Sequence, residues 1–115
     1  MATKNTEMYS QKQYELEQIK DGIIAYFEQH KKEVADFKQA IRRELDEAKT
    51  MLLIFERYYF RNKENVTLVI QLAEFQGYQS ADIFATGGRG YSAEDMLVDF
   101  GIEALKSLGF SGKNI

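Results

Sequence analysis

The segment Gly87-Gly88-Arg89-Gly90, followed by Ser92, has the residue types in this 115-residue sequence best suited to binding an anion. Consecutive glycines can adopt positive φ and turn their N–H groups to one side, which forms an anion-binding concavity. A helix starting directly afterwards adds free N–H donors. Arg89 can bind a phosphate or carboxylate through two hydrogen bonds, and Arg57 is a candidate to assist. These residues define a hypothetical site for a small anionic ligand.

The same corner also has a structural interpretation, which we favour. The pattern GGRG matches neither the P-loop nor the dinucleotide-binding motif. Glu94 and Asp95 complement the positive end of the following helix and would repel an anion. On this interpretation the glycines only let the chain pass from an edge strand into a helix.

Few residues offer catalytic or metal-binding chemistry. The sequence contains no cysteine and a single histidine, His30, which excludes disulfides, thiolate catalysis and cysteine-ligated zinc. No serine or carboxylate is placed by a recognisable motif to form a triad with His30, and no HExxH motif is present. We therefore expect no catalytic residues, no metal and no cofactor, and an enzyme is the least favoured class of function.

The segment Glu56-Arg57-Tyr58-Tyr59 places charges inside an aromatic, strand-like run. We interpret the charges as an internal ion pair or hydrogen bond, with a surface for a partner as the second interpretation. Stacking of single-stranded bases is a third, but the net charge is −3 and the RNA-recognition pattern is missing. Nucleic acid is therefore an unfavoured partner.

The N-terminal half has a helical period. Residues 1–10 are polar and are expected to form a flexible tail, while residues 11–115 form one domain. Apolar residues then recur every three or four positions apart from a gap at His30, which predicts one helix over residues 12–49 or two broken near His30. The stripe comprises Leu16, Ile19, Ile23, Phe27, Val34, Phe37, Ile41, Leu45 and Ala48.

The C-terminal half changes to a strand period. Residues 51–60, 66–75 and 78–85 are predicted strands joined by short polar turns, which indicates a three-stranded antiparallel meander. A helix is expected from Ser92 to about residue 108, with Glu94 and Asp95 on its solvated face. Gly109 is expected to end it in a left-handed conformation, with Phe110 packing back as in a Schellman motif.

The order of four short motifs resembles a family of small bacterial proteins of unknown function. In that family an ERY motif ends one strand, an N-x-(S/T)-L segment begins the next, a glycine pair closes the sheet, and an aromatic-Gly-x-Glu-Ala segment lies in the final helix. The matching residues are Glu56-Arg57-Tyr58, Asn65–Leu68, Gly87-Gly88 and Phe100–Leu105. The resemblance covers roughly residues 50–108 and implies an additional strand where the periodicity predicts a second helix. It implies no biochemical activity.

Together these patterns predict an α+β fold with a helix or helix pair, a three-stranded meander and a C-terminal helix on the sheet. Because the helical stripe is longer than so small a sheet can cover, we expect a homodimer or larger assembly. Its partner surface would be the helix stripe with the outer aromatic face of the strands, and the expected interface residues are Ile19, Ile23, Phe27, His30 and Tyr59. The leading functional hypothesis is a non-enzymatic interaction or regulatory module, and the alternative is an anion-binding protein. No signal peptide or membrane span is recognised, so we expect a cytoplasmic protein.

Overall fold

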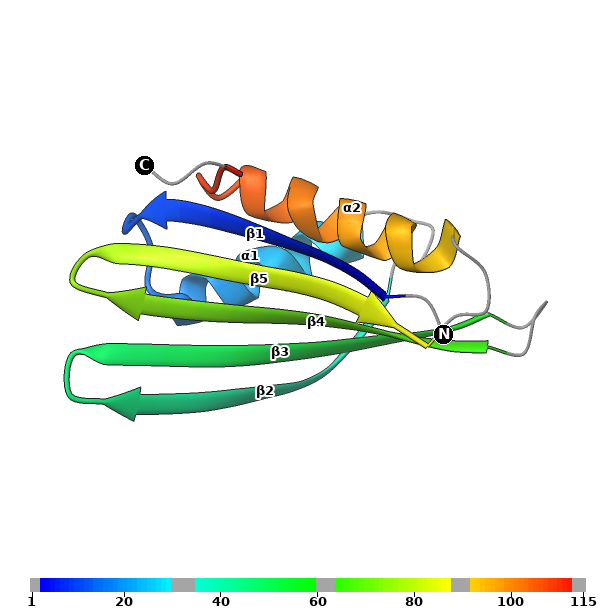
Figure 1. The fold of residues 1–115 in the computed structure, drawn as a ribbon, viewed down its shortest axis with the longest axis horizontal. Coiled ribbons are helices and arrows are strands. Elements are labelled where there is room, and N and C mark those ends of the chain that lie inside the picture. Colours follow the sequence, from blue (N-terminus) through cyan, green and yellow to red (C-terminus); the bar gives the residue numbers. More distant parts are fainter. Residues whose placement is uncertain (1–2, 30–34, 60–63, 88–91, 113–115) are drawn as a thin grey trace.

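The computed structural model describes residues 3–29, 35–59, 64–87 and 92–112. A single antiparallel sheet carries both helices on one of its faces (Figure 1). The elements follow in the order β1 (Thr3–Gln11), α1 (Leu16–Gln29), β2 (Asp36–Leu45), β3 (Ala48–Tyr59), β4 (Glu64–Phe75), β5 (Tyr78–Thr86) and α2 (Ser92–Lys106). No helix in these ranges is long and apolar enough to cross a membrane.

The sheet has five strands in the order β1-β5-β4-β3-β2, and every neighbouring pair is antiparallel. The predicted meander corresponds to β3, β4 and β5, which form the centre of the sheet. The prediction of a three-stranded sheet behind a helix pair is wrong, because β1 and β2 extend the sheet at its two edges.

Strand β2 occupies part of the segment that was predicted to be helical. Phe37, Ile41 and Leu45 have a helical spacing, but a β-bulge between Phe37 and Gln39 shifts the strand alternation. No residue of β2 is buried. Burial of one strand face therefore does not require apolar and polar residues to alternate along β2. Asp46 makes the turn into β3 with a positive φ of 52°, a turn without glycine or proline.

Strand β1 replaces most of the expected flexible tail. It pairs with β5 from Thr3 to Gln11, and its other edge is held at Tyr9 by two backbone hydrogen bonds to Ser111 of 2.7 and 2.8 Å. Its sequence is polar, with Met8 as the apolar residue that enters the core. Pairing with residues about 75 positions away orders this segment, and no local pattern reveals such pairing.

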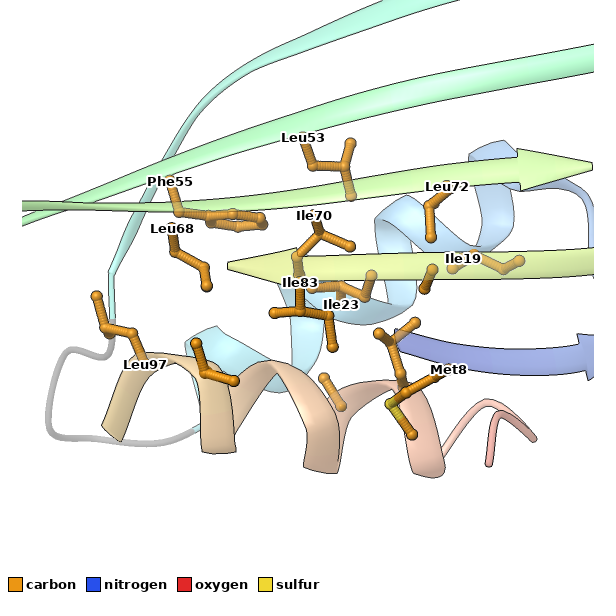
Figure 2. Close-up of a cluster of buried hydrophobic side chains, with 14 of the residues drawn as sticks. Met8, Ile19, Ile23, Leu53, Phe55, Leu68, Ile70, Leu72, Ile83 and Leu97 are labelled. Atoms are coloured by element: carbon orange, nitrogen blue, oxygen red, sulfur yellow. The ribbon is translucent and has the colours of Figure 1, made fainter. Parts of the chain in front are cut away.

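The core lies between the sheet and the helices, where side chains of β3, β4 and β5 meet those of α1 and α2 (Figure 2). The first part of the predicted stripe does form a helix, α1, and it buries Leu16, Ile19, Ile23 and Phe27. Phe27 packs on Phe55 of β3 with ring centroids 4.9 Å apart. The chain's own sheet and α2 therefore cover the stripe that we expected to face a partner.

The C-terminal end of α2 confirms the predicted Schellman motif. Gly109 has a φ of +94°, its N–H donates to the Lys106 carbonyl at 3.1 Å, and the Phe110 N–H donates to the Leu105 carbonyl at 3.1 Å. Phe110 packs back into the core. This ending directs the chain to Ser111, which contacts β1.

Candidate functional site

The face of the sheet opposite the helices, here called the outer face, is not covered by either helix. Along β5 the side chains alternate between buried residues, which face the helices, and partly exposed ones, which face outward. Directly paired residues in an antiparallel sheet point to the same side. The strand register therefore defines rows of outward side chains that cross the whole sheet.

One of these rows is apolar and exposed. Leu45, Ala48, Phe75 and Tyr78 are consecutive partners across β2, β3, β4 and β5, and we call them the apolar row. The exposed fractions are 76% for Leu45, 53% for Phe75 and 57% for Tyr78. The row lies at the end of the sheet where the β2–β3 and β4–β5 turns lie (Figure 1).

Further apolar side chains extend this surface toward the other end of the sheet. They are partly exposed and belong to two neighbouring rows: Ile41, Leu52, Ile54, Val69 and Phe84. The row of Arg43, Thr50, Ala73 and Ser80 lies between them and the apolar row. Exposed apolar side chains gathered on one face of a protein commonly mark an interaction site. The outer face is therefore the candidate functional surface.

A pocket of about 230 Å³ adjoins the apolar row, and we call it the aromatic pocket. Tyr9, Phe75 and Tyr78 contribute aromatic walls, and the small residues Ala73 and Ser80 lie between them. The pocket exists because two small side chains are paired beside larger ones. Its aromatic walls suit a flat or cationic group.

A pair of carboxylates lies next to this pocket. Glu7 and Asp82 are direct partners in the register of β1 and β5, and the Tyr9 hydroxyl donates to Glu7 Oε2 at 2.6 Å. Burial, followed by repulsion from Glu7, raises the pKa of Asp82. The hydrogen bond to Glu7 also raises the pKa of Tyr9. Within the described ranges neither carboxylate has a cation as partner.

Arg43 lies on the outer face at the opposite edge of the sheet, where it pairs with Thr50. Its guanidinium donates to the Arg42 carbonyl at 3.0 Å, and no carboxylate of the described residues pairs with it. The outer face thus has a cation at one edge and two anions at the other.

A second cavity, of about 300 Å³, lies between the start of α1 and the β2–β3 hairpin. Arg43 also lines this cavity. Other charges there are paired: Arg42 donates two hydrogen bonds to Glu17, and Lys49 lies 3.9 Å from Glu44. The hydrogen bond from Arg42, together with Lys20, lowers the pKa of Glu17 to about 2. We interpret these groups as a clamp between α1 and β2.

The glycine corner is described only in part. Gly87 ends β5 with a φ of +106°, and a β-carbon at this position would lie 2.6 Å from the Asn65 carbonyl oxygen. Gly88, Arg89 and Gly90 lie outside the described residues, and Ser92 is the first residue of α2. Arg57 pairs with Val66 and shares a strand face with Phe55, toward the helices. The anion site remains a prediction.

Glu94, at the same corner, lies in a different environment from the one we predicted. We expected it on a solvated helix face, but it is 1% exposed, and neither carboxylate oxygen accepts a hydrogen bond. The side chain enters the core side of α2 because it is one turn before Leu97 and Val98, which are also buried.

The expected interface residues do not form an exposed group. Ile19, Ile23 and Phe27 are buried in the chain's own core. His30 lies outside the described residues, and Tyr59 is the last residue of β3. The sequence analysis expected an outer aromatic face of the strands but did not identify Tyr9, Leu45, Phe75 or Tyr78 on it. The sequence indicated exposure only for Phe75 and Tyr78, because they flank the Gln76-Gly77 turn.

Comparison with family models, with curated proteins and with solved structures finds no match to this chain. The outer face is therefore the feature of the molecule that bears on its function.

Proposed function

We propose that this protein is a non-enzymatic interaction module that self-associates by stacking the outer faces of two sheets. The observation that carries this proposal is the apolar row, in which Leu45, Phe75 and Tyr78 are each more than half exposed. Burying such side chains between two copies removes apolar area from water, which is the main driving force of association.

The size of the outer face suits a specific dimer. Neighbouring strands lie about 4.8 Å apart and rise about 3.3 Å per residue, so five strands of this length span roughly 19 by 30 Å. Two such faces would bury roughly 1,200 Å² in total, at the lower end of the usual range for specific protein interfaces, about 1,200–2,000 Å². A second copy is therefore an occupant of suitable size.

The distribution of side chains also favours one orientation. A two-fold axis parallel to the strands stacks the apolar row of one copy on the apolar row of the other. An axis across the strands would instead place the apolar row on the opposite end of the sheet, where Glu56, Thr67 and Thr86 are paired in register. Stacked sheets commonly align within about 30°. We infer the first orientation, because it buries apolar groups against apolar groups.

Sedimentation velocity over a wide range of protein concentration tests the proposal. We expect the wild-type chain to form a dimer and Phe75→Lys to remain a monomer, because a lysine there would be buried without a partner. Met96→Lys is the matched control, since Met96 is 38% exposed on α2, away from the outer face. It should behave as the wild type. A monomeric wild type, or a Phe75→Lys variant that dimerises equally well, would refute the proposal.

A further inference from the structure

We propose that the aromatic pocket is a binding site for Arg43 of a second copy, whose guanidinium stacks on Tyr9 and Tyr78 and pairs with Glu7 and Asp82. This inference rests on the proposed self-association and names its specific contact. By two-fold symmetry the contact occurs twice in each dimer.

The strand register places the two groups at matching positions. Arg43, Thr50, Ala73, Ser80 and Tyr9 form one continuous row across β2, β3, β4, β5 and β1. A two-fold axis between the two sheets, parallel to the central strand β4, places β2 of one copy over β1 of the other and keeps each residue at the level of its own row. Arg43 of one copy therefore lies over Tyr9 of the other, beside Ser80.

The same contact cannot form within one chain. Arg43 and Tyr9 are on the two edge strands of the sheet, about 19 Å apart at the usual strand spacing of about 4.8 Å. An arginine side chain on a flat sheet cannot span that distance while remaining on its own strand. The pairing is therefore possible only between copies.

The chemistry of the pocket fits a guanidinium. Its planar surface stacks on aromatic rings, and its forked N–H groups match carboxylate oxygens. Glu7 and Asp82 are like charges directly opposite each other, an arrangement that destabilises a strand pair. A cation arriving from the second copy relieves this repulsion. Ala73 and Ser80 leave the space that the guanidinium occupies.

Arg42 provides a useful contrast on the same strand. It points toward the helices and is held by Glu17, whereas Arg43 points outward and pairs with no carboxylate in the described part of the chain. Of these two arginines, Arg43 is thus the one that a second copy can use.

The experiment exchanges the charges of Arg43 and Asp82 and measures the dissociation constant of the dimer for each variant. Arg43→Glu alone and Asp82→Arg alone should each weaken the dimer by roughly 30-fold or more, because each places like charges together in a desolvated site. The double variant Arg43→Glu/Asp82→Arg restores opposite charges and should return to within roughly fivefold of the wild type. Lys106→Glu, an exposed charge reversal on α2, is the control and should change little.

The outcomes separate this inference from the proposed function. A dimer that Phe75→Lys disrupts but Arg43→Glu leaves unchanged would overturn the Arg43 contact and keep the stacked faces. Weakening by both single variants without recovery in the double variant would also overturn the contact. Recovery in the double variant supports it, and circular dichroism of each variant verifies that the fold is retained.

Discussion

Gly87 and Gly77 both have positive φ, but their surroundings differ. At Gly87 a β-carbon would meet the Asn65 carbonyl oxygen at 2.6 Å, whereas at Gly77 no atom lies within 4 Å. Gly77→Ala should lower the free energy of unfolding by about 1 kcal/mol through the left-handed backbone alone. Gly87→Ala should lower it by roughly 2–4 kcal/mol, because the backbone must also move.

Urea denaturation of both variants measures this difference. Equal losses would show that the close approach to Asn65 has no energetic effect. A larger loss at Gly87 would demonstrate that this glycine has a structural role even without any ligand.

We expect the contribution of Glu74 to the free energy of unfolding to depend on pH. Burial raises its pKa, but hydrogen bonds from Lys12 at 2.9 Å and Gln79 at 2.8 Å outweigh burial and leave the pKa below 4.5. Because the folded pKa is the lower one, this stabilisation is present above the unfolded pKa and is lost as pH falls through the folded value.

Glu74→Gln is the test of that component. The free energy of unfolding of the variant should be lower than that of the wild type at neutral pH, by roughly 1–3 kcal/mol. The difference between the two free energies of unfolding should narrow as the pH falls through the folded-state pKa of Glu74, which lies below its ordinary value. Glu103→Gln, at an exposed position beside Lys106, serves as control and should show almost no gap. A gap for Glu74→Gln that does not change with pH would contradict the assignment.

At the scale of elements, Gly101 determines how closely α2 packs on the sheet. A β-carbon there would lie 3.2 Å from Ile83 Cγ2 of β5. Gly101→Leu should therefore lower the free energy of unfolding by roughly 1–3 kcal/mol through overpacking, although leucine is the better helix former. Asp99→Leu, at an exposed position of the same helix, should be neutral or slightly stabilising. Thermal or chemical denaturation of the pair checks this, and similar effects at both positions would contradict close packing at Gly101.

The edge strand β2 should be the least protected part of the sheet. Its residues are all exposed or partly exposed, and among the described residues β3 is its only strand neighbour. In β4, by contrast, Val66, Leu68, Ile70 and Leu72 are fully buried and both edges are paired. Native-state hydrogen exchange should therefore show faster exchange for β2 amides than for β4 amides. Equal protection of the two strands would require another element over β2.

At the scale of the whole molecule, self-association links stability to concentration. If folded chains dimerise through the outer face, mass action raises the melting temperature as protein concentration increases. Phe75→Lys should remove this dependence, while Met96→Lys should keep it. Differential scanning fluorimetry over a wide concentration range provides the measurement. A wild-type melting temperature that does not change with concentration would argue against an outer-face dimer.

Elements with a strong local pattern could be predicted from the sequence. Burial of Leu16, Ile19, Ile23 and Phe27 on one helix follows from their spacing. The strict alternation from Val66 to Leu72 indicates a strand with one buried face, and Gly109 with Phe110 indicates the end of α2. In each case neighbouring residues contain the information, because hydrophobic period and capping are local properties.

The tertiary structure alone determined the edges of the sheet and the candidate surface. Strand β1 is polar and pairs with residues far along the chain. The spacing of four residues between Phe37, Ile41 and Leu45 fits a strand face as well as a helix, and a bulge places Phe37 on the other face of β2. Whether Phe75 and Tyr78 are buried or exposed depends on which face the helices cover, which no local pattern specifies. The physical reason is that strand pairing and face coverage are contacts between distant segments, whereas periodicity records only whether a residue faces the same way as its neighbours.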